Sequence, residues 1–564
     1  MNRTTAWLIF AVTLTLLLVL FGLPLATVLS GGFVVNGEFT FRYLFGVFQN
    51  PIYAEGLLNS LKIALGTTTL VTLIALPLAW LGNRFEFPGK KLMSALVLVP
   101  MILPPFVGAI GLQQILGRYG ALNAALGLGV DWLGLSRYLG VVLLQALGLY
   151  PIMYLNVAAA LANIDPAMEE AAENLSCHGW RKFWRITLPL MMPGVFAGGI
   201  LVFIWSFTEL GTPLILNYTR CAPVQVFDAL KEIGTNPFPY ALVFVMLVTS
   251  CLLYLAGKFA FGGRAFAMQS KAATVAAARP GGWWATLPFG VVIAVALLPH
   301  LGVVLTSLSA PGSWYQSVLP AEWTLGNYRE ALGHSMTVSS IRNSLLYSSL
   351  AVGVNIVLGV AVALVVVRSD LRVRGVLDAI AMLPLAVPGL VMAFGYLAIS
   401  SHLSNQNWVK ESLLWQTLLD VRQNPTLFLV IAYAVRRLPY MVRAAVAGLQ
   451  QTSVTLEEAA ANLGAPPLTT LRRVTLPLIA ANLVAGVLLA FSFSMLEVSD
   501  SLMLAQRADF FPITKTIFEL FQLIGTGKYI AAALGVWAMV FLAVTILGAS
   551  LILGKKMGAL FRVG

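Results

Sequence analysis

The sequence predicts an all-α integral membrane protein with about 12 transmembrane helices, arranged as two homologous, parallel six-helix halves. Three observations support this fold class. The chain is 59% hydrophobic and only 10% charged, whereas soluble proteins carry about a quarter of charged residues. Apolar windows of about 20 residues recur along its length. The motifs of the first half also return in the second half.

The apolar windows account for the predicted transmembrane helices. The first window lies in MNRTTAWLIFAVTLTLLLVLFGLPLATVLS, which has the basic start of a signal peptide. Its apolar run is longer than 20 residues and lacks a clear A-x-A cleavage site, so we expect a retained first span. The windows are centred near residues 18, 70, 104, 150, 204, 249, 296, 354, 387, 438, 492 and 541.

Basic residues predict the orientation of these spans. An even number of spans places both termini on one side, and the loops on that side are rich in Lys and Arg, whereas the opposite loops carry fewer. By the positive-inside rule both termini are cytoplasmic. Most of the net charge of +12 then faces anionic lipid and the cytoplasm. We therefore expect no nucleic acid partner. The residues concerned are Arg84, Lys90, Lys91, Arg181, Lys182, Arg185, Lys258, Arg264, Lys271, Arg279, Arg368, Arg372, Arg374, Arg472, Arg473, Lys555, Lys556 and Arg562.

An internal repeat divides the chain. Asn59-Ser60-Leu61 returns as Asn343-Ser344-Leu345, an offset of 284, and beyond a four-residue insertion the offset is 288. Because six spans is an even number, the two halves have the same orientation about an axis along the membrane normal. We therefore expect a first half at residues 1–265, a cytoplasmic linker at 266–283 and a second half at 284–564.

Two charged segments stand out within this apolar chain. EEAAENLSCHGWRKFWRITLPL at 169–190 and EEAAANLGAPPLTTLRRVTLPL at 457–478 agree at 11 of 22 positions. Loops usually drift in sequence, so this agreement favours docking surfaces for another protein over charged loops of no special purpose. The Ala-Ala pairs leave a surface that another protein can approach closely.

Local signals in these segments predict two short helices each. Asp165 precedes a proline as an N-cap in the first copy, and Thr455 and Glu458 have capping-box spacing in the second. Gly179 and Gly464 offer a break after the first helix. We therefore expect a helix, a turn and a second helix on the cytoplasmic face, near 166–190 and 455–478.

The pattern E-A-A, three residues, Gly, nine residues, Ile or Val, one residue, Leu-Pro resembles the signature of permease subunits of type I bacterial ABC importers. The second copy matches it fully, and in the first copy Ser176 stands where the family has glycine. Fusion of both halves in one chain is similar to the ferric-iron and thiamine importers. The resemblance implies that these residues couple the chain to an ATPase: Glu169, Glu170, Ala171, Ala172, Ser176, Gly179, Glu457, Glu458, Ala459, Ala460 and Gly464.

The resemblance also implies the location, which is the inner membrane of a bacterium, and the partners. Each loop would engage one ATP-binding subunit on the cytoplasmic side, so two copies are expected, with a substrate-binding protein on the outer side. The chain has no G-x-x-x-x-G-K-[ST], because Gly527-Lys528 is followed by Tyr529 and Gly554-Lys555 by Lys556. We therefore expect a transport subunit that has no catalytic residues and binds no cofactor, with ATP and Mg on the partner subunits.

Three acids within the spans are candidates for the substrate pathway: Glu209, Glu497 and Asp500. Acids within a bilayer usually face a bundle interior or water. In a vestibule they would favour a cationic substrate over an anion. The resemblance to the ferric-iron importers implies ferric iron as the cargo, with thiamine, a polyamine or another small solute as alternatives. A neighbouring hydroxyl or basic group could instead satisfy each glutamate, or the side chain could reach the outer interface.

Other features leave alternatives open. Pro100, Pro104, Pro105, Pro384 and Pro388 fall within spans, where they permit either hinges for alternating access or fixed kinks. A 12-span secondary transporter driven by an ion gradient would share the layout of two halves but would not need twin E-A-A loops. Cys177 and His178 are neighbours, yet two residues without further ligands predict no metal site.

Overall fold

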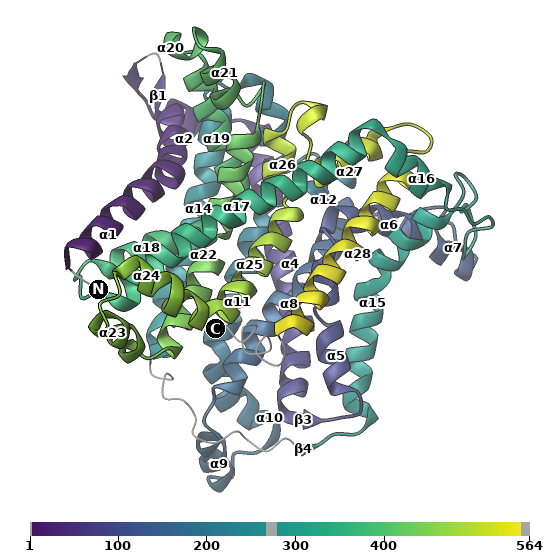
Figure 1. Cartoon of the computed structure of the whole chain (residues 1–564). Helices are drawn as coiled ribbons and strands as arrows, with labels where there is room; N and C mark the ends of the chain where they lie inside the picture. Colours follow the sequence, from purple (N-terminus) through teal and green to yellow (C-terminus); the bar gives the residue numbers. More distant parts are fainter. Residues whose placement is uncertain (1–2, 36, 267–278, 554–564) are drawn as a thin grey trace.

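The structure is a computed structural model, which describes residues 3–35, 37–266 and 279–553 (Figure 1). The described chain is mostly helical, with two short pairs of strands. The predicted all-α membrane fold is therefore confirmed. Most of the predicted linker, including Lys271, and the basic residues Lys555, Lys556 and Arg562 lie outside the described residues.

Among the described residues, nine helices are long and apolar enough to cross a membrane, or 11 if each of two bent helix pairs is one span. The predicted span near residue 438 is not among these 11. It corresponds to helix α22 (Thr426–Gln451), which carries Arg436, Arg437 and Arg443. Helix α22 packs on α17 (Ser335–Arg368) and α25 (Leu476–Met495) in the second half, as α8 (Arg137–Ala162) packs on α4 (Pro51–Arg84) and α11 (Leu188–Phe207) in the first half. It thus takes the place of a span in spite of its charges.

The repeat is visible in the order of the helices. The first half contains α1 (Arg3–Leu17), α2 (Leu23–Phe33), α3 (Arg42–Gln49), α4 (Pro51–Arg84), α5 (Lys90–Leu96), α6 (Pro105–Leu116), α7 (Ala121–Leu126), α8, α9 (Pro166–Asn174), α10 (Gly179–Lys182), α11 (Leu188–Phe207), α12 (Gly211–Ile215), α13 (Ala222–Asp228) and α14 (Phe238–Phe266). The second half contains α15 (Trp283–Leu308), α16 (Gly326–Gly333), α17 (Ser335–Arg368), α18 (Arg374–Met382), α19 (Gly389–Ser404), α20 (Asn407–Lys410), α21 (Leu413–Leu419), α22, α23 (Val454–Asn462), α24 (Pro467–Thr470), α25 (Leu476–Met495), α26 (Ser499–Leu504), α27 (Ile513–Gln522) and α28 (Gly527–Leu553).

One span in each half is sharply bent. The pair Lys90–Ile102 and Pro105–Leu126 bends by 98°, and so does the pair Arg374–Leu385 and Gly389–Ser404. Each break ends at a proline, Pro104 or Pro388, which lacks a backbone donor and cannot continue the preceding helix without a clash. The structure therefore confirms bends at these prolines.

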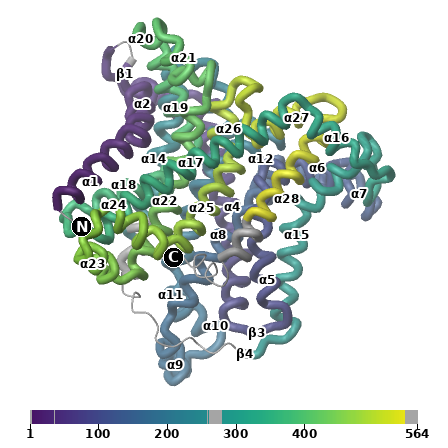
Figure 2. Tube along the Cα trace, in the orientation of Figure 1, coloured from purple at the N-terminus to yellow at the C-terminus, as the bar shows by residue number. Residues whose placement is uncertain are grey.

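The first span of each half packs against the bent span of the other half. A Cβ added to Gly395 in α19 would lie 2.8 Å from the carbonyl oxygen of Pro24 in α2. A Cβ added to Gly111 in α6 would lie 2.3 Å from the carbonyl oxygen of Pro299 in α15. Both crossings need glycine for close approach. Figure 2 shows α2 beside α19, and α15 in the same region as α6, so the halves interlock.

A short parallel strand pair links the two halves on the side of α9. Strand β3 (Phe85–Glu86) follows α4 and pairs with β4 (Arg279–Pro280), which precedes α15. The Gly281 amide donates to the Glu86 carbonyl at 2.6 Å. A second pair, β1 (Val34–Val35) and β2 (Glu38–Phe39), is antiparallel and lies beside α20 (Figure 1). The start of the second half is thus held by the first half.

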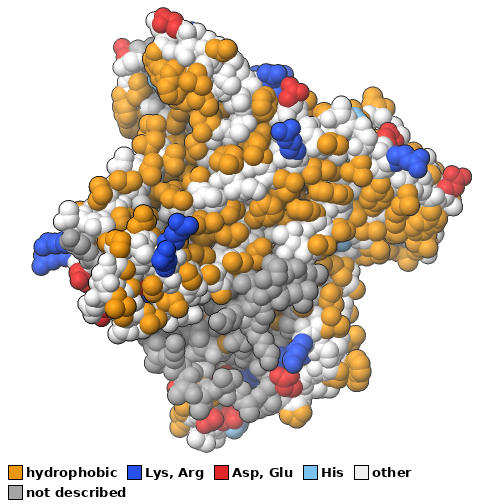
Figure 3. Space-filling view, viewed as in Figure 1, with side chains coloured by type: hydrophobic (Ala, Val, Ile, Leu, Met, Phe, Trp, Pro, Cys, Tyr) orange, Lys and Arg blue, Asp and Glu red, His pale blue; other side chains and the backbone are white. Residues whose placement is uncertain are grey.

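The outer surface of the helices is apolar. Leu8, Leu65, Leu287 and Val357 are each more than half exposed, and Figure 3 shows hydrophobic side chains over wide areas with charged groups mainly toward the edges. A water-soluble protein rarely exposes such large apolar areas. This surface fits contact with lipid.

Candidate functional site

The two E-A-A segments form matched loops, here called the EAA loops (residues 165–187 and 453–475). Each consists of a helix of nine residues, a turn and a helix of four residues: α9 with α10, and α23 with α24. Both loops project from the lower left of the molecule, away from α7, α16, α20 and α21 (Figure 1). We call this end of the molecule the EAA face.

The N-caps differ from the sequence expectation in one copy. Asp165 caps α9 as predicted, its Oδ1 accepting from the amide of Ala167 at 2.9 Å. In the second copy the capping residue is Ser453, whose Oγ accepts from the amide of Thr455 at 3.3 Å. The predicted capping box of Thr455 and Glu458 is therefore wrong. Thr455 lies inside the first turn because the serine two residues earlier provides the cap.

The turns after α9 and α23 have the same conformation. Ser176 (φ 60°) and Gly464 (φ 80°) occupy equivalent positions in the left-handed region. The next amide in each copy donates to the carbonyl five residues earlier, Cys177 to Ala172 at 2.9 Å and Ala465 to Ala460 at 3.0 Å. This is the hydrogen bond of a Schellman turn. Ser176 therefore adopts the left-handed conformation at the position where the family has glycine, whereas Gly179 begins α10.

The first glutamate of each EAA loop binds an arginine at the end of a long helix. Arg84, the last residue of α4, donates to Glu169 at 2.5 Å. Arg368, the last residue of α17, donates to Glu457 at 3.1 Å and to the carbonyl of Thr452 at 3.1 Å. All four side chains of these ion pairs are at most 21% exposed. Each EAA loop is thereby fastened to the bundle.

The second glutamate of each loop, Glu170 or Glu458, is exposed. Of the alanine pairs, Ala171 and Ala459 are exposed and so form the small-residue surface, whereas Ala172 is buried and Ala460 half-buried. These placements agree with a surface that another protein can approach. The role of these residues in coupling remains a prediction.

Exposed apolar side chains at matched positions are a feature that the sequence reasoning missed. Leu175 is 83% exposed and its equivalent Leu463 89%; Trp180 is 72% exposed and its equivalent Leu468 75%. Apolar residues at the same two places in both copies, beside charged residues, were the available signal. Large apolar groups that repeat in this way on a polar surface are typical of a protein interface.

The first EAA loop has more internal contacts than the second. Lys182 pairs with Glu173 at 2.6 Å and lies 3.9 Å from Glu169. The equivalents of Lys182 and Glu173 in the second copy are Thr470 and Ala461, which are uncharged. The second loop therefore depends more strongly on its single arginine.

The three acids predicted for the pathway lie where the halves meet. Glu209 follows α11 and Glu497 follows α25. A Cβ added to Gly211, at the start of α12, would lie 3.2 Å from Cγ1 of Val498, which precedes α26. Glu209 and Glu497 are therefore each within two residues of a contact between the halves. Their assignment to the substrate pathway remains a prediction.

In the second half the acids are paired with arginines. Glu497 is 4% exposed and accepts from Arg436 at 2.8 Å and from Arg437. Asp500 is 1% exposed and lies 3.8 Å from Arg436. Two basic and two acidic groups thus compensate each other. A neighbouring basic group therefore satisfies Glu497, which is one of the alternatives that the sequence left open. The sequence reasoning did not connect the two arginines of α22 to this glutamate.

In the first half Glu209 has no ion pair among the described residues. Its carboxylate accepts from the amide of Thr212 at 3.0 and 2.9 Å, and from Gln145 at 3.4 Å. The positions equivalent to Arg436 and Arg437 are Gly148 and Leu149. The backbone of α12 and a neutral amide therefore stabilise the Glu209 carboxylate, and its charge is not compensated by a base.

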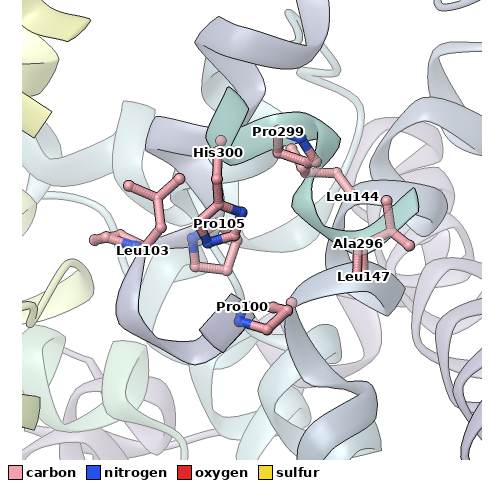
Figure 4. A pocket seen from close by; sticks show the side chains of 11 residues that line it. Pro100, Leu103, Pro105, Leu144, Leu147, Ala296, Pro299 and His300 are labelled. Carbon is pink, nitrogen blue, oxygen red and sulfur yellow. The ribbon is translucent and has the colours of Figure 1, made fainter. Parts of the chain in front are cut away.

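A pocket accompanies this difference between the halves (Figure 4). In the first half Gly148 faces Pro105, and in the second half the Arg436 guanidinium fills the place of a Cβ on Gly389. The space that Arg436 fills in the second half has its counterpart in a small pocket at Gly148 in the first half, which is partly open to solvent. The lining residues are Pro100, Leu103, Pro104, Pro105, Gly108, Leu144, Leu147, Gly148, Ala296, Pro299 and His300.

Comparison with known proteins agrees with this architecture. The family described as "Binding-protein-dependent transport system inner membrane component" matches residues 71–261 and 355–552, one match in each half. The chain belongs to this family, and it is a fused permease of the type I ABC importer class. It is accordingly a multi-span protein of the inner membrane.

The relatives include permeases for two kinds of cargo. The chain is 25% identical over 478 residues to the ferric transport system permease protein FbpB of Actinobacillus pleuropneumoniae, covering 81% of this chain and 64% of the relative. It is 26% identical over 504 residues to the Fe(3+)-transport system permease protein FbpB 2 of Haemophilus influenzae, covering 88% and 90%. It is 33% identical over 192 residues to the molybdenum transport system permease protein ModB of Escherichia coli, covering 32% and 81%.

Proposed function

We propose that this chain is the membrane component of an ATP-driven importer whose cargo is ferric iron. The observation that carries the proposal is the matched pair of EAA loops, each fastened to a long helix by an arginine, on a chain without a P-loop. One ATP-binding subunit would dock on each loop, so two copies are required. ATP and Mg would be bound by those subunits.

The same geometry supports the direction of coupling. A partner that moves the EAA loops would pull on α4 and α17 through Arg84 and Arg368. These helices pack directly on α8 and α22, respectively. Gln145 of α8 donates to Glu209, and Arg436 of α22 donates to Glu497, so both helices contact the acids near the contact between the halves. Alternating access along the pseudo-twofold axis would follow. In this orientation the EAA face and both termini are cytoplasmic, and a substrate-binding protein docks on the opposite face.

Ferric iron is supported by the names of the relatives that match both halves. The charges near the contact between the halves agree with a cation, because they comprise three acids (Glu209, Glu497 and Asp500) and two bases (Arg436 and Arg437). The resulting net negative charge would disfavour an oxyanion such as molybdate. Thiamine or a polyamine would also be compatible with this charge.

Reconstitution tests the proposal. Proteoliposomes that contain the chain, the ATP-binding subunit and the binding protein should take up ferric iron only when ATP is present on the side of the membrane that the EAA face and the ATP-binding subunits occupy. The chain alone should move nothing uphill. Uphill uptake by the chain alone, driven by a proton or sodium gradient, would instead identify a secondary transporter.

A further inference from the structure

Three exposed basic side chains gather at the end of the first half that lies opposite the EAA face. Lys62 lies on α4, Arg137 is the first residue of α8, and Arg220 lies between α12 and α13. We call these three residues the Lys62 cluster. They lie outside the EAA loops and outside the group formed by Glu209, Glu497, Asp500, Arg436 and Arg437.

Backbone contacts bring the three residues to one side of α4. The hydroxyl of Tyr138, next to Arg137, donates to the carbonyl of Lys62 itself at 3.1 Å. Asn59, one turn before Lys62 on α4, donates to the carbonyl of Arg220 at 2.8 Å. The cluster is therefore built from three separate elements.

The loop that carries Arg220 is tied to the other two elements as well. Arg137 donates to the carbonyl of Asn217 at 2.9 Å. Hydrogen bonds thus fix the relative positions of the backbone segments, while the charged ends of Lys62 and Arg220 remain exposed.

The cluster carries a net positive charge. The exposed acid Glu55 pairs with Arg220 at 3.3 Å. Lys62 and Arg137 form no ion pair in the described part of the chain. Two positive charges are therefore left for a ligand.

The cluster lies at the level of lipid headgroups. Lys62 precedes Arg84, at the other end of α4, by 22 residues, or about 33 Å of helix. The hydrocarbon core of a bilayer is about 30 Å thick. Leu58 and Leu65, which flank Lys62 on α4, are 51% and 53% exposed, and Leu139 on α8 is 59% exposed. Basic groups at the rim of such an apolar surface meet phosphate, while the leucines meet acyl chains.

The cluster is not a consequence of the repeat. The residue equivalent to Lys62 is Leu346, and the residue equivalent to Arg137 is Pro425. In the loop, Asn343 donates to the carbonyl of Phe511 at 3.3 Å, as Asn59 does to that of Arg220, so Phe511 takes the place of Arg220. The second half keeps the backbone contact without any of the three charges.

We propose that the Lys62 cluster binds the phosphate group of an anionic phospholipid in the leaflet opposite the EAA face. The Lys62 ammonium and the Arg137 guanidinium bind the phosphate oxygens, and the acyl chains lie along Leu58, Leu65 and Leu139. The apolar flank distinguishes this site from a site for free phosphate. The proposal does not depend on the identity of the cargo.

Lipid binding by the full chain tests this proposal. The purified chain in a neutral detergent is titrated with phosphatidylglycerol or phosphatidylcholine, and bound lipid is measured by native mass spectrometry. The variants are Lys62→Gln with Arg137→Gln, and a matched control, Arg342→Gln, which removes an exposed arginine from α17 in the second half. We expect the double variant to bind phosphatidylglycerol about 30-fold more weakly, with phosphatidylcholine binding unchanged and the control like the native chain.

Further arms separate the alternatives. The variant Lys62→Arg with Arg137→Lys keeps both charges and should retain the lipid, which distinguishes lost charge from lost fold. Unchanged phosphatidylglycerol binding in the double variant overturns the proposal, and so does an equal loss in the Arg342→Gln control. Displacement of the lipid by millimolar inorganic phosphate would show a free-anion site instead. Retained lipid with lost transport would assign the cluster to a protein partner, and would also overturn the proposal.

Discussion

Arg84 and Glu169 form an ion pair of 2.5 Å that joins the last residue of α4 to the helix α9 that carries the first E-A-A motif. The repeat places Arg368 and Glu457 in the same relationship at 3.1 Å. The motif thus has two glutamates with different surroundings: the first holds the loop to the bundle, and the second is exposed. A force applied to the loop can reach a 34-residue helix through one contact.

Removal of both arginines should uncouple ATP hydrolysis from transport. In the variant Arg84→Gln with Arg368→Gln, each loop loses a partly buried ion pair, worth about 1 kcal/mol or more, but keeps its own helices. We expect uptake to fall about tenfold while ATP hydrolysis by the assembled complex continues. The ratio of ATP hydrolysed to substrate transported, measured in proteoliposomes, reports this directly.

The single variants should differ. Lys182 lies 3.9 Å from Glu169 and has no charged equivalent in the second loop, so Arg368→Gln should reduce uptake more than Arg84→Gln. Lys90→Gln, which removes an exposed pair with Glu86, is the matched control. Equal uptake in all three single variants would show that the arginine contacts do not transmit force.

The exposed leucines of the EAA loops should contribute to the affinity for the ATP-binding subunit. Leu175→Ser with Leu463→Ser removes two side chains that are 83% and 89% exposed in the free chain. Burial of a leucine contributes about 1.5 kcal/mol or more, so the affinity should fall about tenfold per loop, measured by surface plasmon resonance. Leu287→Ser on the lipid-facing side of α15 is the control, and it should leave docking unchanged. Normal affinity in the double variant would contradict the proposed docking surface.

The serine in the first turn should carry a cost in stability. Ser176 adopts φ 60°, which is unfavourable for a residue with a Cβ by about 1 kcal/mol. Ser176→Gly should therefore stabilise the first turn, and amide hydrogen exchange in α9 should slow about fivefold. Gly464→Ala should accelerate exchange in α23 by a similar factor. The opposite order of the two variants would show that the turn conformation does not limit local opening.

The sequence predicted those features that need no knowledge of contacts between distant segments, and it missed those that do. Apolar length and the repeat can be recognised without knowledge of which segments are in contact, so the membrane fold, the two halves and the paired short helices were predictable. The exchanged contacts at Gly395 with Pro24 and at Gly111 with Pro299 were not, because they join segments far apart in the chain. The capping residue Ser453 was missed because two candidate hydroxyl residues lie two positions apart.

The pathway acids show the same limit. The sequence showed that Glu209 and Glu497 occupy equivalent positions, and this suggested equivalent surroundings. Only the packing of α22 against α25 shows that Arg436 and Arg437 reach Glu497. Their equivalents Gly148 and Leu149 leave Glu209 without such partners. Equivalent positions in a repeat therefore do not ensure equivalent electrostatics.

Glu209 and Glu497 should respond differently when each is replaced by glutamine. We expect Glu497 to stabilise the fold. Glu497→Gln leaves the buried Arg437 with its compensating charge removed, and breaking such a pair by removing one partner costs about 3 to 5 kcal/mol. We expect a lower yield of folded protein and a lower apparent Tm in detergent. Arg437→Gln alone should have a similar effect, and the combination of the two should recover part of the loss, because no unpaired charge remains. Native stability in Glu497→Gln would contradict this role.

Glu209 should instead affect transport. Glu209→Gln keeps the size of the side chain and its hydrogen bonds to Thr212 and Gln145, so the fold should be retained. It removes an uncompensated charge beside the contact between the halves, and a charge that concentrates a cation in a cleft raises its association rate about tenfold or more. Ferric iron uptake in the reconstituted complex should therefore fall about tenfold, with protein yield and ATP-binding subunit affinity unchanged. Glu232→Gln, at an exposed acid near α13, controls for a general change in surface charge. Unchanged uptake in Glu209→Gln would mean that this acid only stabilises α12, and a faster uptake would mean that the charge obstructs the cargo.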